Sequence, residues 1–188
     1  DAEYITWLTV APDLTDITTF IPFLKRIEKN SNFKYLKIVD DARYESEENY
    51  SFIEENNQIS FIKPSNYEIS KTRKYKNDIS RIDNMDYYSE SDLFICQNGK
   101  KLIANWIKIR KSKTGYESVK TIYICEDCSN CNYKSQCIKG NNSKISLEKR
   151  TKKFETSKKF NRQRKEDLER IITDEGILLR MNRSIQAE

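Results

Sequence analysis

Four of the five cysteines lie in one short stretch, and their spacing is the strongest chemical signal in the sequence. Cys125, Cys128, Cys131 and Cys137 form a C-x2-C-x2-C-x5-C array. Short loops of this kind bring thiolates around one metal ion, and thiolates satisfy tetrahedral Zn²⁺. Because the chain has no histidine, the array predicts a structural zinc site made of these four cysteines.

Two other interpretations of the cysteine array stay open. Disulfide bonds of a secreted domain would use the same residues, but no signal peptide is visible and nothing else indicates an oxidising compartment. An iron–sulfur cluster is the second alternative, since C-x2-C-x2-C opens the bacterial ferredoxin motif. The five-residue gap and the lack of a proline after Cys137 count against it. Cys96, in a turn-like segment, is an alternative ligand.

The net charge of +5 conceals a division along the chain. Residues 1–62 hold 6 Lys/Arg and 12 Asp/Glu, a net charge of −6, whereas residues 63–188 hold 28 and 17, a net charge of +11. The basic part is expected to face a polyanion, the alternative being a solvated lysine-rich surface. No apolar run approaches the roughly 20 residues of a membrane-spanning helix, so no membrane partner is expected.

A pair of aspartates is the second candidate for chemistry. Asp40 and Asp41 follow a predicted strand over residues 35–39. The carboxyl ends of parallel strands border the crevice in which α/β folds bind ligands. Asp41 is the better catalytic candidate, with Asp40 as its rival because the register of the strand is unknown. An aspartate in a turn before a helix is the alternative explanation.

Alternating strands and helices must position these aspartates. β-Branched and aromatic residues predict strands, and residues 17–27 and the segment after the N-cap Ser46 show helical patterns. The β-α-β-α-β order predicts an open α/β sheet with parallel neighbouring strands. The expected elements are a strand over 4–10, a helix over about 17–27, a strand over 35–39, a helix over about 46–56 and a strand over 59–62.

The regular alternation is lost after residue 64. Asn98-Gly99 predicts the turn of a hairpin, and a strand over 120–124 leads directly into the cysteine array. Residues 150–173 are predicted to be a basic helix, and Gly176 is a candidate C-cap. The apolar stripe of that helix is expected to consist of Phe160, Leu168, Ile171 and Ile172. The basic part, and this helix in particular, is expected to bind DNA through Lys152, Lys153, Lys158 and Lys159.

Several segments together resemble the DDE transposases of bacterial insertion sequences. The run Val39-Asp-Asp-Ala-Arg-Tyr-Glu-Ser-Glu-Glu-Asn-Tyr50 resembles their second-aspartate motif, and Ile59-Ser-Phe-Ile-Lys-Pro64 resembles the strand that follows it. The cysteine-rich segment and residues 175–188, which end in Arg183-Ser-Ile-Gln-Ala-Glu188, resemble the later part of the same domain. The resemblance is to the group numbered eleven eighty-two, covers essentially the whole chain and keeps the motifs in order.

The resemblance implies an α/β fold with an incomplete RNase H-like core of the DDE integrase/transposase type. A cysteine-rich insertion of β-hairpins held by zinc interrupts this core. The implied organisation is a first part of the core at residues 1–63, a basic insertion with the four-cysteine site at 64–150, and a helical return to the core, truncated, at 151–188.

The resemblance also implies a chemistry, which is DNA cleavage and strand transfer. In this class three carboxylates hold two Mg²⁺ ions that promote phosphoryl transfer, and carboxylate oxygens suit Mg²⁺. By motif position Asp41 is the second acid and Glu188 the third. Arg183 would contact phosphate or anchor its helix. The implied partners are DNA, at the element ends and the target, and a second copy in a homodimer, in the bacterial cytoplasm at the nucleoid.

The first aspartate of the family is expected upstream of this chain, so residues 1–188 alone are predicted to be a fragment that cuts no DNA. Arg43 and Glu45 stand where the family has glycines. The loop is expected to need the conformational freedom of glycine at these positions, and the substitutions are expected to place a Cβ there and a long cation beside the site. The alternative function is a zinc-stabilised DNA-binding module without catalysis.

Overall fold

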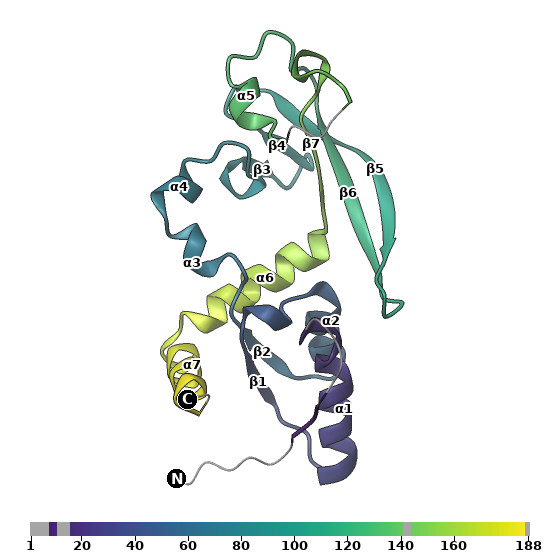
Figure 1. Ribbon diagram of the computed structural model, residues 1–188, viewed down its shortest axis with the longest axis vertical. Coiled ribbons are helices and arrows are strands. Elements are labelled where there is room, and N and C mark those ends of the chain that lie inside the picture. Colours follow the sequence, from purple (N-terminus) through teal and green to yellow (C-terminus); the bar gives the residue numbers. More distant parts are fainter. Residues whose placement is uncertain (1–7, 11–15, 141–143, 187–188) are drawn as a thin grey trace. The chain divides into compact units, whose positions relative to one another are not determined.

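The computed structural model describes residues 8–10, 16–140 and 144–186. Contacts divide the chain into two compact units, and each is assembled from segments that are distant in the sequence (Figure 1). Unit 1 comprises Asp1–Tyr67, Lys111–Ser118 and Lys159–Glu188, and unit 2 comprises Glu68–Arg110 and Val119–Lys158. Both helices and strands occur along the chain, so the fold is a mixed α/β fold.

In its described residues, unit 1 is built on two parallel strands. β1 (Lys37–Asp40) pairs with β2 (Ile59–Ile62), from Lys37 opposite Ile59 to Asp40 opposite Ile62. Helix α2 (Glu47–Glu55) connects them, and its N-cap Ser46 accepts a hydrogen bond from the Asn49 backbone at 3.0 Å. The predicted parallel pairing of these two strands and the helix that begins after Ser46 are confirmed.

The apolar core of unit 1 lies between helices and this strand pair. Helix α1 (Phe20–Ser31) follows a 3-10 turn, η1 (Asp16–Thr18), and Pro22 lies in its first turn, where backbone N–H groups have no partner within the helix. The predicted strand over residues 4–10 lies mostly outside the described residues, and residues 8–10 form no strand. The buried core residues are Phe20, Ile38, Tyr50, Ile53 and Ile62.

Helix α6 (Lys158–Ile171) differs from the helix predicted over residues 150–173. Its beginning is later, because β7 (Lys153–Thr156) forms an edge strand of another sheet. The predicted apolar stripe is also partly wrong: Leu168 and Ile172 are exposed, whereas Gln163 and Asp167 are fully buried. The buried face of α6 is therefore largely polar.

This polar face of α6 binds the open edge of β2. The Asp167 carboxylate accepts a hydrogen bond from the Ile62 backbone at 2.7 Å, and the Arg170 guanidinium donates to the Ser60 backbone carbonyl at 3.0 Å. Arg170 also lies 3.2 Å from the Asp167 carboxylate. These side chains replace the backbone partners that a further strand would give, so β2 has no unsatisfied edge at these groups.

The sequence suggested that Gly176 is the C-cap of the preceding helix. It lies instead inside helix α7 (Asp174–Gln186). Thr173 caps α7 by accepting a hydrogen bond from the Gly176 backbone at 3.1 Å. A Cβ at Gly176 would lie 2.2 Å from the Arg170 carbonyl oxygen and 2.7 Å from the Ile171 Cα. The glycine therefore permits the close approach of α7 to the end of α6, and α7 then packs on β1 and β2.

Unit 2 contains a five-stranded sheet in the order β3-β4-β5-β6-β7. The predicted Asn-Gly hairpin is confirmed, because β4 (Leu93–Ile95) and β5 (Lys101–Lys111) are antiparallel, with Phe94 opposite Leu102. The remaining strands are β3 (Asp86–Tyr88) and β6 (Glu117–Cys125). The other short helical segments of the described chain are η2 (Ala42–Tyr44) in unit 1, α3 (Tyr67–Ser70) at the boundary between the units, and, in unit 2, α4 (Arg73–Lys76), η3 (Ile82–Asn84), α5 (Lys134–Cys137) and η4 (Leu147–Lys149).

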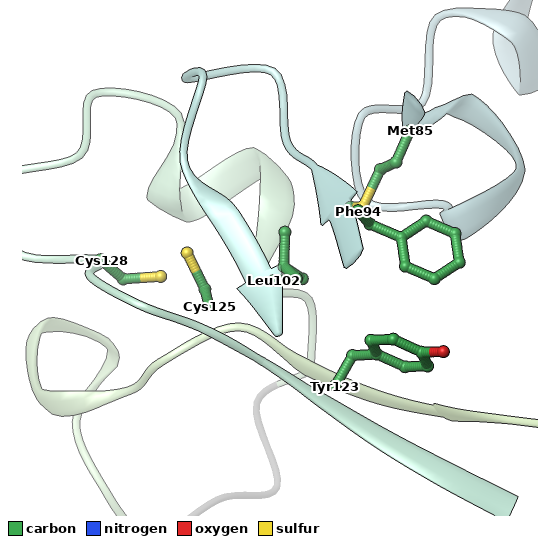
Figure 2. Close-up of a cluster of buried hydrophobic side chains, with 6 residues drawn as sticks. All are labelled: Met85, Phe94, Leu102, Tyr123, Cys125 and Cys128. Carbon is green, nitrogen blue, oxygen red and sulfur yellow. The ribbon is translucent and has the colours of Figure 1, made fainter. Parts of the chain in front are cut away.

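The core of unit 2 combines aromatic rings with two cysteines. Phe94 packs edge-on against Tyr123 and Phe154, with ring centroids 5.0 and 5.1 Å apart. The Tyr123 hydroxyl donates to the Asp92 carboxylate at 2.6 Å, so its polar end is satisfied. Figure 2 shows Cys125 and Cys128 beside Leu102 at one end of this cluster.

We expect Gly176→Ala to lower the free energy of unfolding by about 1–3 kcal/mol, the usual cost of overpacking. The clash is with backbone atoms, so no rotation of a side chain relieves it. Urea denaturation measures the change. Leu178→Ala is the control, because Leu178 is on the same helix and 57% exposed, and it should change stability by less than about 0.5 kcal/mol. Equal stability of the two variants would contradict the close approach.

Candidate carboxylate site and cysteine cluster

The two candidate aspartates lie at the carboxyl end of β1, where the sequence placed them. β1 ends at Asp40, and Asp41 is the N-cap of η2, accepting a hydrogen bond from the Arg43 backbone at 2.8 Å. The Asp40 carboxylate accepts a hydrogen bond from the Asp41 backbone at 3.0 Å. The Asp41 side chain is 40% exposed and that of Asp40 is 20% exposed, so Asp41 is more accessible to a ligand.

Arg183 on α7 contacts both carboxylates. Its Nη2 lies 3.4 Å from Asp40 Oδ1 and 3.3 Å from Asp41 Oδ2. Burial raises the pKa of Asp40 to about 6, while the Asp41 backbone N–H and the Arg183 guanidinium act in the opposite direction. Arg183 thus anchors α7 to the carboxylates in this structure.

The arrangement supplies hard oxygen ligands of the kind that Mg²⁺ prefers. Asp40 and Asp41 present two neighbouring carboxylates, and Arg183 adds a positive charge beside them. Glu188, the predicted third acid, lies outside the described residues. Among the side chains that the structure describes, no group of three or more His, Cys, Asp or Glu is arranged to hold a metal ion. The Mg²⁺ site therefore stays a prediction.

The two residues at the family's glycine positions do not strain this loop. Glu45 has φ −66°, and Arg43 is absent from the described non-glycine residues with positive φ. The Arg43 side chain is 79% exposed and forms an ion pair with Asp16 at 3.6 Å. The expected need for glycine at these two positions is therefore wrong for this chain.

Glu45 instead forms a buried ion pair. Its side chain is 1% exposed, and its two carboxylate oxygens accept hydrogen bonds from Arg164 of α6 at 2.6 and 2.8 Å. The Ser65 backbone donates to the same carboxylate at 2.8 Å. This bidentate pair fastens the loop after Asp41 to α6 and to the segment after β2, so Glu45 helps to position the carboxylate loop.

All five cysteines line one small cavity of about 20 Å³ in unit 2. Cys125 and Cys128 are buried, whereas Cys96, Cys131 and Cys137 are half-buried, and all five are free thiols. Burial raises the pKa of Cys125 to about 12, with Cys128 and Cys96 adding to the effect. The donor set fits Zn²⁺, since thiols of this spacing converge on one cavity, although they are not arranged as ligands here.

The four lysines predicted to bind DNA have different environments. Lys152 is half-buried and donates to the carbonyls of Ser80 at 2.7 Å and Cys137 at 3.1 Å. Lys158 pairs with Asp92 at 2.6 Å. Lys159 lies over the Tyr116 ring at 5.9 Å, and Lys153 on β7 is exposed. The sequence predicted that Lys152 and Lys153 lie on a basic helix. This is wrong, because both precede α6.

Sequence reasoning missed the structural roles of Lys152, Glu45 and Arg164. A signal was present for the last of these, because Arg164, Asp167 and Arg170 recur at a spacing that places them on one face of a helix. Charges at such a spacing usually mark a solvated face, so the pattern alone did not indicate burial.

The class of protein follows from a family comparison. The family described as "Transposase DDE domain" matches residues 95–188, which is half of the 188-residue chain. The chain belongs to this transposase family. The match covers all five cysteines, α6 and α7, whereas Asp40 and Asp41 precede it.

Comparisons with curated proteins and with solved structures give no match. None of the described helices is both long enough and apolar enough to cross a membrane.

We expect Glu45→Gly to lower the free energy of unfolding by about 3 kcal/mol, because it leaves Arg164 without its buried partner. Arg43→Gly is the matched control, since Arg43 is in the same loop and exposed, and it should cost about 1 kcal/mol or less. Chemical denaturation of the two variants and the parent gives both values. A Glu45→Gly protein as stable as its parent would show that the ion pair does not hold the loop.

Proposed function

We propose that the chain is part of a DDE transposase that cuts and joins DNA by phosphoryl transfer with two Mg²⁺ ions. The proposal rests on one observation, the carboxylate pair at the end of β1 that Arg183 contacts, in a chain of the transposase DDE family. In it, unit 1 belongs to an RNase H-like core, and the family is the insertion-sequence group numbered eleven eighty-two.

Each residue has a role in this proposal. Asp41, the more exposed aspartate, provides metal-binding oxygens, and Glu188 provides the third acid. Arg183 neutralises the pair in this structure and would turn to a DNA phosphate when a cation replaces it at the carboxylates. Bound Mg²⁺ would activate the attacking hydroxyl and stabilise the leaving oxygen. Glu45 and Arg164 fix the loop that carries Asp41.

The cysteines have a structural role in the proposal. Cys125, Cys128, Cys131 and Cys137 are the ligands that the sequence predicts for one Zn²⁺ ion, which would hold the long segment between β6 and β7. Closing such a site contributes folding free energy directly. The segment between β6 and β7 has few buried apolar side chains, so a bound Zn²⁺ ion would supply the stabilisation that an apolar core does not.

Catalysis is tested in the complete protein encoded by the gene, with DNA that carries an element end. We expect Mg²⁺-dependent cleavage, and we expect Asp41→Ala to reduce its rate by more than about 100-fold. Loss of a residue that only hydrogen-bonds a metal ligand already reduces activity by about 10–100-fold, and Asp41 is proposed to bind the metal directly. Glu55→Ala is the control, because Glu55 is an exposed acid on α2. Cleavage by Asp41→Ala at the parent rate would reject this role and favour Asp40 or a non-catalytic DNA-binding module.

DNA binding by the basic part should depend steeply on salt, because counterions are released from phosphates. We expect Lys153→Glu to weaken binding and to reduce the slope of log affinity against log salt by roughly 0.9 for each phosphate that the protein no longer neutralises. Fluorescence anisotropy with a duplex measures the slope, and the melting temperature should not change. Lys152→Glu is the comparison, since it removes two half-buried hydrogen bonds and should lower the melting temperature. An unchanged slope for Lys153→Glu would identify Lys153 as solvated surface.

A further inference from the structure

Cys96 lies at the same end of the unit 2 sheet as Cys125. β4 ends at Ile95 and β5 begins at Lys101, while β6, beside β5, ends at Cys125. Two hydrogen bonds join these ends: the Glu126 backbone donates to the Lys101 carbonyl at 2.9 Å, and the Lys101 backbone donates to the Glu126 carboxylate at 3.1 Å. The sheet thus brings together two cysteines that are 29 positions apart in the sequence.

A tight turn fixes the backbone of Cys96. Its N–H donates to the Lys100 carbonyl at 3.0 Å, and its carbonyl accepts from the Gly99 N–H at 2.8 Å. Gly99 has φ +70°, the left-handed conformation that glycine adopts without strain. The Cys96 side chain packs against the buried cluster that contains Cys125 and Cys128. The backbones of Cys96 and Cys125 are both held by hydrogen bonds, the latter through its N–H to the Lys152 carbonyl at 2.9 Å. Their side chains line one cavity together with that of Cys128, and Figure 2 shows the thiols of Cys125 and Cys128 turned toward each other.

Lys152 ties a fourth cysteine to this group. Its backbone N–H donates to Cys128 Sγ at 3.3 Å, and its Nζ donates to the Cys137 carbonyl at 3.1 Å. The Cys131 carbonyl, in comparison, accepts only the local hydrogen bond from the Lys134 backbone at 3.0 Å among the described backbone contacts. Lys152, a residue of another segment, thus contacts both Cys128 and Cys137, whereas the carbonyl of Cys131 is bonded within its own turn.

Lysine side chains accompany the cysteines around the cavity. Lys100, Lys134 and Lys152 line it together with the cysteines. Four thiolates around Zn²⁺ carry a net charge of −2, which cations and N–H donors to sulfur stabilise. Structural zinc has four ligands, so five thiols at one cavity leave one over.

We propose that the thiolate metal centre is formed by Cys96, Cys125, Cys128 and Cys137, with Cys131 as the spare thiol. The inference rests on the proposed zinc centre and changes its membership. Four thiols lose their protons and bind the ion, so the centre would connect the turn before β5 to the end of β6 and to α5. The site would then be discontinuous in sequence and would not be a single local loop.

The test compares the chain with two matched variants, Cys96→Ser and Cys131→Ser. We expect about one Zn²⁺ per chain in the parent and in Cys131→Ser by metal analysis. Cys96→Ser should bind Zn²⁺ more than about 100-fold less tightly, since it loses a direct ligand. Co²⁺ substitution gives an independent readout, because thiolate-to-cobalt absorption should decrease in Cys96→Ser and persist in Cys131→Ser. Retention of Zn²⁺ by Cys96→Ser, or its loss from Cys131→Ser, overturns the inference.

A second measurement needs no variant, so it remains decisive if Cys96→Ser fails to fold. Iodoacetamide treatment of the zinc-loaded parent, followed by peptide mass spectrometry, should modify Cys131 and spare the four proposed ligands. Modification of Cys96 at the rate of Cys131 in a protein that holds one Zn²⁺ refutes the inference but leaves a zinc centre in place. A parent that binds no Zn²⁺ refutes the zinc centre itself, and the inference with it.

Discussion

The open edge of strand β2 is the constraint on which the organisation of unit 1 depends. Within the residues that the structure describes, β1 and β2 are a pair of four-residue strands, and the exposed backbone groups of β2 need partners. Asp167 and Arg170 of α6 supply these partners, and Gly176 lets α7 follow at close range. The position of Arg183 at the carboxylates is a consequence, because α7 follows α6 directly in the chain and packs on β1 and β2.

The elements that the sequence predicted correctly are those with local signals. Ser46 caps α2 with its own side chain, and Asn98-Gly99 turns the chain between two strands. The polar face of α6 has no such signal, because Asp167 finds its partner 105 positions away and Arg170 finds its partner 110 positions away. A buried charge is indistinguishable from a solvated one until its partner is placed.

In the candidate sites, too, local signals were found from the sequence and contacts between distant residues were not. Residue type and strand position were sufficient to locate Asp40 and Asp41, and spacing was sufficient to identify the cysteine array. The meeting of Cys96 with that array depends on the order of strands in the sheet. The family's glycine positions misled for a related reason, since Glu45 gains a buried partner, Arg164, on a distant helix. Motif comparison does not reveal such compensation.

Because the two units are made of interleaved segments, they become complete at different times during synthesis. Every residue of unit 2 has been polymerised by Lys158, whereas unit 1 still lacks α6 and α7 at that point. Domains generally fold as units while the chain emerges from the ribosome, and distant contacts form slowly. The cysteine-rich unit can therefore fold first, while the β2 edge stays open until residues 159–188 are added. Nascent chains are most exposed to edge-to-edge association during that interval.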